Sequence, residues 1–532
     1  MSLRIISICV AGALLSASAA ADEPAASHFV TSAQCIACHA QLTAPSGEDI
    51  SIGFDWRATM MANAARDPYW HAAVRRELLD HPVAQAAIED KCATCHMPMA
   101  RFDAAAAGGR GEVFANLAPA APQHALAADG VSCTVCHQIT AEGLGEHASF
   151  DGGFAIDTHS DPRVLFGPHE VDVGRQAVMR SAATFTPRAA THIQQSELCA
   201  TCHTLYTTAL DDAGETIGSL PEQMPYQEWL HSDYRGTNSC QSCHMPEVSA
   251  ETAISSVLAQ PRPRVSQHTF LGANAFVLTL LNQHRGELGV AALPQELDAS
   301  VGATKRYLAS QAAALTVAAR RSGSRLDVDL AVASTTGHKL PTAYPSRRAW
   351  LHVVVTDGGG AVVFESGAAR ADGSIAGNDN DADGARFEPH YDEVTSADQV
   401  QIYEAIMVDR SDAVTTGLPR AVRFAKDNRL LPRGFDKTTA AAEVAVQGGA
   451  TADTSFTAGG DRIRYRVELP AAARGPVTVT AELLYQSIGY RWAENLRAYD
   501  AAETQRFVRY YEGAAAGSAL PLARATAVVD GR

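Results

Sequence analysis

Ten of the eleven cysteines in this chain lie in five copies of one motif, Cys-x-x-Cys-His. In chain order, box 1 to box 5 consist of Cys35, Cys38 and His39; Cys92, Cys95 and His96; Cys133, Cys136 and His137; Cys199, Cys202 and His203; and Cys240, Cys243 and His244. This motif is the attachment signature of c-type haem. Two thiols bind one porphyrin covalently, and the histidine that follows becomes the proximal ligand of its iron. The sequence therefore predicts five covalent haems.

Three other uses of paired cysteines explain the motif less well. Zinc ribbons place two Cys-x-x-Cys units about 15–20 residues apart, whereas the first cysteines of successive boxes are 57, 41, 66 and 41 residues apart. Zinc sites and structural disulfides both leave five histidines unexplained. A thioredoxin-like redox motif needs a strand and helix beside it and occurs once per domain. Haem is the interpretation that uses every residue of every box.

Charge, length and the N-terminal residues narrow the class of protein. The formal net charge of −16 disfavours nucleic-acid binding and suits docking on basic redox partners. A length of 532 residues predicts two or more domains. Residues 1–21 have the pattern of a signal peptide, with Arg4, an apolar run over 5–15 that includes Cys9, and a small-residue cleavage site. We expect an exported protein, periplasmic or extracellular, without a membrane span.

The periodicity of apolar residues divides the mature chain into two halves. Helical patterns occur at 70–79, 84–91 and 273–285. From about residue 312, apolar and polar residues alternate as in half-buried strands, at 315–317, 326–332, 350–355, 462–469 and 477–484. We therefore expect an α+β protein. A pentahaem domain of short helices and loops around stacked haems spans 22–285, a linker spans 286–310, and a β-sandwich-like domain spans 311–532.

Over residues 56–274 the sequence resembles multihaem c-type cytochromes of the c-552/4 type. The resemblance rests on Asp129–Gln138 around box 3, on Ser196–Cys199 at box 4 and on Cys240–Pro246 at box 5. In that family a distal histidine often precedes a box, another follows the last box in a Ser-x-His-x-Phe context, and a third lies in a Gly-His-x-x-Pro-Thr turn. The resemblance implies that the distal iron ligands include His192, His268 and His338.

The sequence departs from this family pattern at two places. Related cytochromes carry Trp-x-x-Ser-x-His with the histidine as a distal ligand, but here the last position is Met61 once and Tyr234 once. Met61 could complete a histidine–methionine iron of raised potential, and Tyr234 could leave an iron weakly liganded. Both could instead be core residues of helices. The other candidates for the vacant distal positions are His71, His81, His124 and His231, and the ligand set we predict includes Met61 and His124.

A short acidic segment in the second half matches part of a calcium loop. Asp379, Asp381 and Asp383 alternate before a glycine, as in the first half of an Asp-x-Asp-x-Asp-Gly site for Ca²⁺. The twelfth position is His390 where an EF-hand needs an acidic residue, so a simpler calcium loop and a solvated acidic turn are the two interpretations. His390 could alternatively reach a haem.

Two classes of function remain open on the sequence. Five boxes within 210 residues leave too little polypeptide to bury each porphyrin separately, so we expect haems in contact that transfer electrons between partner proteins, with no catalytic residue. The alternative is a multihaem oxidoreductase with one open iron for small nitrogen or sulfur compounds. Related reductases commonly replace one box histidine by lysine, and no Cys-x-x-Cys-Lys occurs here. An oligomer or filament that shares haem ligands between chains is a third possibility.

Overall fold

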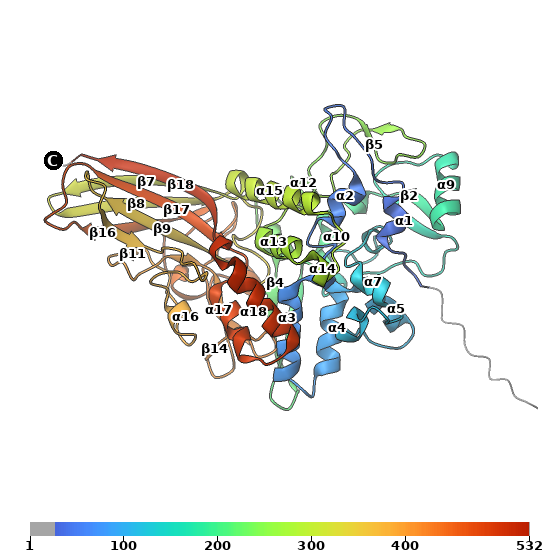
Figure 1. Cartoon of the computed structure of the whole chain (residues 1–532), viewed down its shortest axis with the longest axis horizontal. Coiled ribbons are helices and arrows are strands. Elements are labelled where there is room, and N and C mark those ends of the chain that lie inside the picture. The colour runs from blue at the N-terminus through green and yellow to red at the C-terminus, as the bar shows by residue number, and fades with distance from the viewer. Residues whose placement is uncertain (1–26, 531–532) are drawn as a thin grey trace, which may run out of the picture.

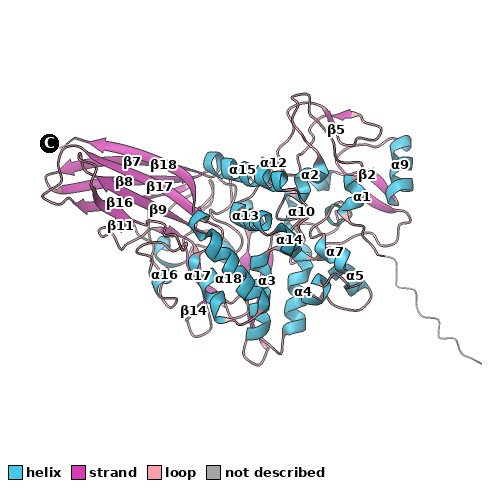
Figure 2. Ribbon diagram, viewed as in Figure 1, coloured by secondary structure: helices cyan, strands magenta, loops and turns pink. Residues whose placement is uncertain are grey.

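Residues 27–530 of the chain are described by a computed structural model. The predicted signal peptide over 1–21 lies outside these residues. The structure is mixed α and β, as expected, with short helices gathered in the N-terminal half and long strands in the C-terminal half (Figures 1 and 2). Within the described residues, no helix is both long and apolar enough to cross a bilayer.

The helical half is built from short elements joined by long loops. Its helices are α1 (Ser32–Ile36), α2 (Ile52–Arg57), α3 (Pro68–Asp80), α4 (Gln85–His96), α5 (Pro98–Ala106), α6 (Phe114–Leu117), α7 (His124–Ala128), α8 (Cys133–Cys136), α9 (Val173–Ala183), α10 (Ser196–Ala200), α11 (Pro225–Leu230), α12 (Cys240–His244) and α13 (Ala275–Gln283). Three two-stranded sheets pair β1 (Arg163–Gly167) with β2 (Phe185–Ala189), β3 (Leu205–Leu210) with β4 (Thr216–Gln223), and β5 (Thr252–Ala253) with β6 (Pro261–Arg262). The helices predicted at 70–79, 84–91 and 273–285 are confirmed as α3, α4 and α13.

Local sequence explains why α3 begins where it does. Asp67 caps the helix by accepting the backbone N–H groups of Tyr69 and Trp70 at 2.8 and 3.3 Å, and Pro68 occupies the first helical position, where no N–H is needed. The next helix, α4, carries box 2 in its last turn. These two helices therefore bring the residues of box 2 beside Trp70.

The C-terminal half contains two larger sheets that share one core. One sheet has the order β10 (Val362–Ser366), β9 (Arg348–Thr356), β17 (Val477–Gln486), β18 (Leu520–Val529), with β12 (Ile402–Tyr403) also paired to β9. The other has the order β11 (Glu393–Val394), β16 (Gly460–Glu468), β8 (Arg325–Ser334), β7 (Ala313–Ser322). Side chains of β8, β9, β16 and β17 alternate between buried and accessible, and their buried faces form a single apolar cluster. The strand predictions at 315–317, 326–332, 350–355, 462–469 and 477–484 are confirmed.

Smaller elements cover the ends of these sheets. They are α16 (Asp379–Ala382), β13 (Ala405–Val408), β14 (Val414–Thr415), β15 (Arg423–Asp427), α17 (Tyr490–Glu494) and α18 (Ala502–Ala514). Helix α18 packs against α3 of the helical half, where Arg75 and Glu503 form a bidentate ion pair at 2.9 Å. The end of the chain therefore returns to the helical half.

The segment 286–310, which the sequence predicted to be a linker, is mostly helical. It forms α14 (Arg285–Leu288) and most of α15 (Pro294–Gln311). Pro294 opens α15, and Glu296 accepts the N–H of Leu293 at 2.9 Å, so the helix has a strong start. Its buried side chains, Leu297 and Leu308 among them, pack on α13 and on the C-terminal sheets. This segment therefore packs against both halves of the chain.

Candidate haem-binding site

Each box lies on a single turn of helix. The backbone N–H groups of His39, His137 and His203 donate to the carbonyl of the first cysteine of their own box at 2.9, 3.1 and 3.0 Å, and α4 and α12 end on His96 and His244. Residues i, i+3 and i+4 share one face of a helix. The spacing Cys-x-x-Cys-His therefore turns both thiols and the imidazole of each box to the same side.

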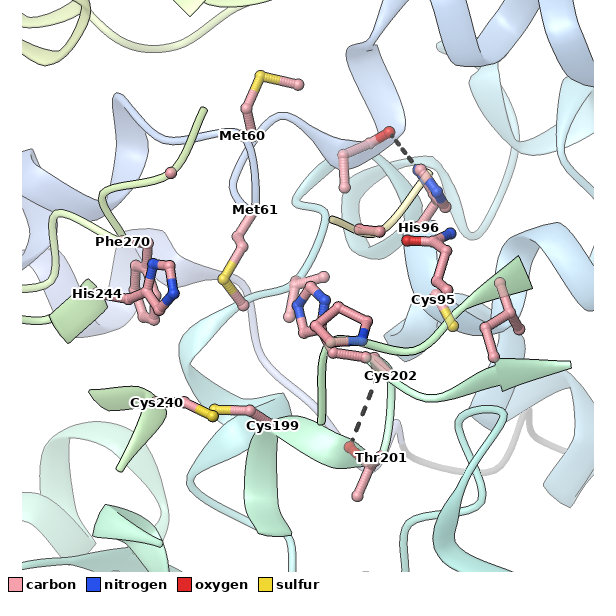
Figure 3. A pocket seen from close by; sticks show the side chains of 18 of the residues that line it. Met60, Met61, Cys95, His96, Cys199, Thr201, Cys202, Cys240, His244 and Phe270 are labelled. Carbon is pink, nitrogen blue, oxygen red and sulfur yellow. Dashed lines mark hydrogen bonds between the residues drawn. The ribbon is translucent and has the colours of Figure 1, made fainter. Parts of the chain in front are cut away.

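The five boxes face one cavity of about 1920 Å³. All five box histidines and nine of the ten box cysteines line it, and all ten cysteines are free thiols. Pockets for single small ligands are about 300–1,000 Å³, so this cavity is larger than one such ligand needs. Figure 3 shows part of it, with Cys95, Cys199, Cys202 and Cys240 of boxes 2, 4 and 5.

Contacts between thiols show which boxes are neighbours. The thiols of Cys35 and Cys133, of Cys95 and Cys202, and of Cys199 and Cys240 lie close enough to shift each other's pKa. The Cys199 thiol lowers the pKa of Cys240 to about 7, and Cys240 in turn raises the pKa of Cys199. Box 1 therefore adjoins box 3, and box 4 adjoins both box 2 and box 5. The order of the boxes in space differs from their order in the chain.

Four box histidines are held in the tautomer that binds a metal. The Nδ1 atoms of His39, His96 and His137 lie 2.6, 3.0 and 2.6 Å from backbone carbonyl oxygens, and Nδ1 of His244 also contacts a carbonyl. A carbonyl only accepts, so Nδ1 carries the hydrogen and Nε2 keeps its lone pair. Burial also lowers the pKa of His96 and His203 to about 4, so both imidazoles are neutral near pH 7.

Two further histidines stand opposite box histidines at a spacing that suits an iron between them. The ring centres of His137 and His268 are 6.4 Å apart with their planes at 17°, and those of His244 and His338 are 6.2 Å apart at 12°. Two metal–nitrogen bonds of about 2.0–2.1 Å and two ring radii of roughly 1.15 Å add to about 6.4 Å. Nδ1 of His268 and of His338 contacts a carbonyl oxygen at 3.1 and 2.9 Å, so Nε2 is again free.

The structure sets His192 apart from the cavity. Its Nε2 lies 2.8 Å from the carbonyl oxygen of Ile139, so this nitrogen carries a hydrogen and donates it. The ring is buried and packs edge-on against Phe166 at 5.0 Å. Phe166 in turn accepts the Nδ1 hydrogen of His137. His192 therefore supports the segment that orients a box histidine and does not face an iron position.

Met61 extends into the cavity (Figure 3). Its backbone carbonyl accepts the N–H of Val131 at 3.0 Å, next to box 3. Gly130 makes this approach possible, because it has φ of 64° and a Cβ there would lie 2.7 Å from the Met61 carbonyl oxygen. The thioether is thus placed among the boxes, as a distal ligand must be.

The remaining candidates are engaged elsewhere. Nδ1 of His124 donates to the Asn116 carbonyl at 3.0 Å, and His124 does not line the cavity. Both ring nitrogens of His71 are bonded, to the carbonyl of Ala65 and to Arg506. His231 likewise has partners at both nitrogens, 2.8 and 3.3 Å away. His81 lies outside the cavity lining as well.

Sequence reasoning missed one histidine that the cavity contains. His169 follows β1 and lines the cavity, and burial lowers its pKa. No motif surrounds it in the sequence. The N–H of Phe166 in β1 donates to the carbonyl of His137 at 2.6 Å, which holds this segment beside box 3. Met60, Met179 and Met245 line the same cavity and widen the choice of soft ligands.

Asp379, Asp381 and Asp383, the residues of the predicted calcium loop, have other hydrogen-bond and ion-pair partners in the structure. Arg348 binds the Asp381 carboxylate with two hydrogen bonds of 2.7 and 3.0 Å, with both side chains buried. Arg386 pairs with Asp379, and Asp383 accepts a backbone N–H two residues ahead at 3.0 Å. Two of the three carboxylates are therefore paired with arginine, which favours the interpretation of an acidic turn over that of a calcium loop.

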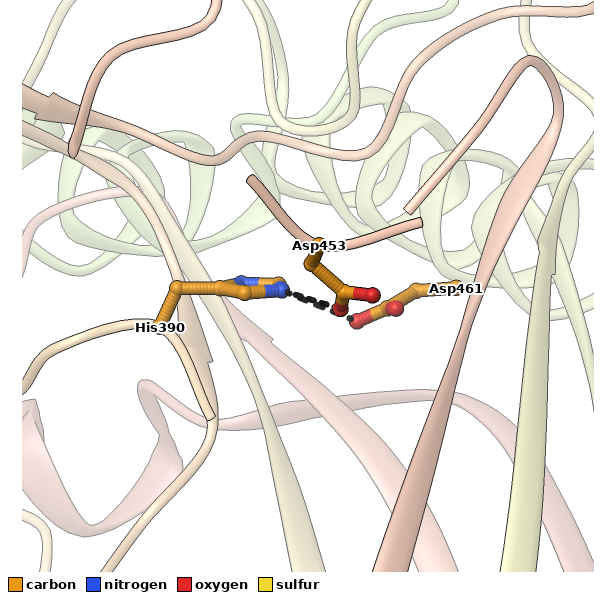
Figure 4. Close-up of side chains that lie close together, drawn as sticks. All are labelled: His390, Asp453 and Asp461. Atoms are coloured by element: carbon orange, nitrogen blue, oxygen red, sulfur yellow. Dashed lines mark hydrogen bonds and ion pairs between the residues drawn. The ribbon is translucent and has the colours of Figure 1, made fainter. Parts of the chain in front are cut away.

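His390 lies in the C-terminal half beside two aspartates (Figure 4). Its Nε2 is 3.0 Å from Asp453 and 3.9 Å from Asp461, and all three side chains are buried. Within residues 27–530 they are the one group in which three metal-type ligands bring atoms within 4.8 Å of one another. His390 is absent from the cavity lining, so it does not reach a box.

The hydrogen bonds of His390 place its ring hydrogen on Nε2, the nitrogen that a metal ion beside the two aspartates would have to bind. The side-chain amide nitrogens of Gln401 and Asn428 lie 2.9 and 3.0 Å from Nδ1. Each amide oxygen accepts a separate backbone N–H, at 2.8 and 3.0 Å, which fixes the orientation of both amides. Nδ1 therefore accepts and Nε2 carries the hydrogen that Asp453 receives. A metal-binding histidine needs the opposite arrangement, so this cluster is a buried hydrogen-bond network.

Box turns on short helices around one large cavity define a multihaem cytochrome-like fold. The chain is similar to a solved structure, the penta-heme cytochrome c552 from Thermochromatium tepidum, with a TM-score of 0.50 and 13% sequence identity. The similarity covers 94% of this chain and 99% of that chain. At this identity the likeness concerns the fold. No family model and no curated protein sequence matches the chain.

Proposed function

We propose that the chain is an exported pentahaem c-type cytochrome that transfers electrons between redox partner proteins. One observation carries the proposal: all five box imidazoles and nine of the ten box cysteines line a single cavity, and two of the five imidazoles have a second imidazole at a spacing that suits an iron between them. The fold likeness to a pentahaem cytochrome supports the count of five.

The residues present fit c-type haem. Each box offers two free thiols for thioether bonds and one histidine for the proximal position, and four of the five histidines have Nδ1 bonded so that Nε2 is available. His268 would complete the iron of box 3, and His338 that of box 5. Met61 and His169 also line the cavity and are candidate ligands for two of the remaining irons. Haem bound at these positions would supply one-electron iron chemistry at potentials set by its axial ligands and burial.

The contacts between boxes suggest a branched path for electrons. Cys35 meets Cys133, Cys199 meets Cys240, and Cys95 meets Cys202. Cys136 of box 3 also lies within electrostatic range of Cys202. The boxes thus run in the order 1, 3, 4, 5, with box 2 joined at box 4. This arrangement gives a chain with three ends, at boxes 1, 2 and 5.

The location of the protein and the charge of its redox partners are inferred from its sequence. The signal-peptide pattern at 1–21 favours export to the periplasm or beyond, and the net charge of −16 favours basic electron donors and acceptors. Surplus histidines leave room for a ligand shared with a second chain, which makes an oligomer the arrangement to test.

A second candidate function, catalysis at one open iron, is favoured by the environment of box 2. The ring of His96 stacks on Trp70 at 4.4 Å, and no imidazole pair of the kind seen at boxes 3 and 5 occurs there among residues 27–530. Glu77 and Glu222 are buried in the cavity wall near Cys92, and burial raises the pKa of both. Buried carboxyl groups beside an open iron could exchange protons with a small substrate.

Intact-mass measurement of the exported protein tests the main proposal. Five covalently added haems per chain are expected, and a Cys92→Ala, Cys95→Ala double variant should carry four. A colourless protein with the mass of bare polypeptide would overturn the proposal. Carbon monoxide titration of the reduced protein separates the two functions, because an electron-transfer chain with fully liganded irons binds none and an enzyme with one open iron binds one equivalent.

A further inference from the structure

His338, the histidine opposite box 5, comes from the C-terminal half of the chain. It lies in the turn between β8 and β9, whereas His244 belongs to α12 of the helical half. The two ring centres lie 6.2 Å apart only if this turn is held against the helical half. The position of His338 therefore depends on contacts between the halves.

Four charged side chains make those contacts. Glu228 of α11 pairs with Arg429 at 2.9 Å, Arg429 binds Asp427 with two bonds of 2.8 and 2.7 Å, and Asp427 accepts from Lys339 Nζ at 2.7 Å. Lys339 directly follows His338 in the chain. The network thus runs from the helical half, through the C-terminal half, to the residue beside the distal histidine.

Glu228 also accepts hydrogen bonds from the turn that carries His338. One oxygen of its carboxylate accepts the backbone N–H of Lys339 at 3.1 Å and the hydroxyl of Thr342. On the other side of His338, the hydroxyl of Tyr234 donates to the carbonyl of Thr335 at 2.9 Å. Tyr234 therefore helps to hold this turn in place. This role accounts for a tyrosine at the position where related proteins carry a distal histidine. The turn is fastened before and after His338 from the helical half.

The four charged side chains of this network are almost fully buried. The side chains of Glu228 and Lys339 are 0% exposed, and those of Asp427 and Arg429 are 3% and 9% exposed. Two carboxylates and two cations balance to zero, so loss of any one leaves a buried charge without its partner. Burial by itself would raise the pKa of Asp427, but Arg429 and Lys339 outweigh it and hold that pKa far below its usual range.

We infer that Glu228, Asp427, Arg429 and Lys339 form an ionic latch between the halves that positions His338 on the iron of box 5. The inference rests on the proposed function. It gives the C-terminal half a specific role, because this half supplies one axial ligand and the latch keeps that ligand in place. Weakening the latch should free His338 and open one iron, with every haem still attached.

The test compares matched variants of the full-length, haem-loaded protein. Glu228→Gln and Asp427→Asn break the latch, and His338→Ala removes the ligand itself. Glu404→Gln is the control, because Glu404 forms an equally buried ion pair with Lys426 at 2.9 Å inside the C-terminal half. Haem number is read by intact mass, and open irons are read by carbon monoxide titration and by the high-spin signal in electron paramagnetic resonance.

We expect His338→Ala to bind one equivalent of carbon monoxide more than the parent. Glu228→Gln and Asp427→Asn should gain at least half an equivalent, and added imidazole should restore their low-spin spectra. Glu404→Gln should gain none. If Glu228→Gln fails to fold, Arg429→Lys is read in the same way, because it keeps the charge and loses the two-pronged contact with Asp427.

Two results would overturn the latch. One is parental carbon monoxide binding in folded Glu228→Gln and Asp427→Asn proteins that carry five haems. The other is an equal gain in the Glu404→Gln control, which would show that any buried charge defect opens the iron. Both leave the proposed function intact. Absence of haem from the parent protein is the distinct result that removes the proposed function.

Discussion

His268→Ala is the sharpest test of how an iron is held at box 3. The ring centres of His137 and His268 are 6.4 Å apart. Two ring radii of roughly 1.15 Å and two metal–imidazole bonds of about 2.05 Å add to the same length, so an iron fits between nitrogens placed on the line that joins the two centres. Removing one ring leaves a gap that alanine cannot fill. One iron in five should become five-coordinate, and carbon monoxide binding should rise by one equivalent per chain.

His268→Met gives the same experiment a second readout. A thioether in place of an imidazole favours reduced iron, so we expect the potential of one haem to rise by on the order of 100 mV within the range of about 0.8 V that axial ligands cover. Potentiometric titration followed at the haem absorption bands measures the shift. The other four haems should titrate as in the parent.

His192→Ala is the matched control, since His192 was also predicted to be a distal ligand and is buried. Its Nε2 donates to the carbonyl of Ile139, so its loss should open no iron. An unchanged spectrum in His268→Ala, or an open iron in His192→Ala, would refute the assignment of ligands from ring spacing and tautomer.

Three further predictions follow from buried charges. Asp381→Asn removes the partner of Arg348 and should lower the free energy of unfolding, measured by chemical denaturation, by about 3–5 kcal/mol. Chelators such as EDTA should leave the stability of the parent protein unchanged. A fall in stability with EDTA would support the calcium loop instead. Burial next to Asp49 and Glu48 raises the pKa of Asp55 to about 7, so this carboxyl keeps its proton in the folded state and the free energy of unfolding should fall as pH rises from about 4 to 7. Asp55→Asn should reduce this dependence of stability on pH. An unchanged dependence would show that Asp55 is not responsible. Asp453→Asn should cost about 1–3 kcal/mol by weakening the acceptor of the His390 hydrogen, and elemental analysis should find iron without a second stoichiometric metal; zinc bound at one per chain would contradict the tautomer of His390.

The secondary structure of the C-terminal half can be predicted from the sequence. Alternation of apolar and polar residues over 326–332 and 462–469 reflects strands with one buried face, and the structure pairs these two strands residue by residue. Residues 286–310 resemble a linker in the sequence, although Leu297, Thr304 and Leu308 fall on one helical face. Their apolar stripe is narrow, so the packing partners of α15 decide its role more than its own composition does.

Side-chain partners were the less predictable part of the site. The aspartates at 379, 381 and 383 match a calcium pattern, but Arg348, more than thirty residues earlier in the chain, takes the central carboxylate. The family resemblance suggested His192, His268 and His338 on equal terms. Only the fold distinguishes them, because it sets two opposite box histidines and engages the third with a backbone carbonyl.

The sequence by itself determined the five boxes, because a thiol, a thiol and an imidazole at i, i+3 and i+4 meet within a single helical turn and need no distant residue. The tertiary structure alone decided which boxes adjoin and which residue stands across from each imidazole. His268 lies 131 residues beyond His137, and His338 lies 94 residues beyond His244. Such pairs are made by the packing of remote segments, and in the second case by buried charges that join the two halves of the chain.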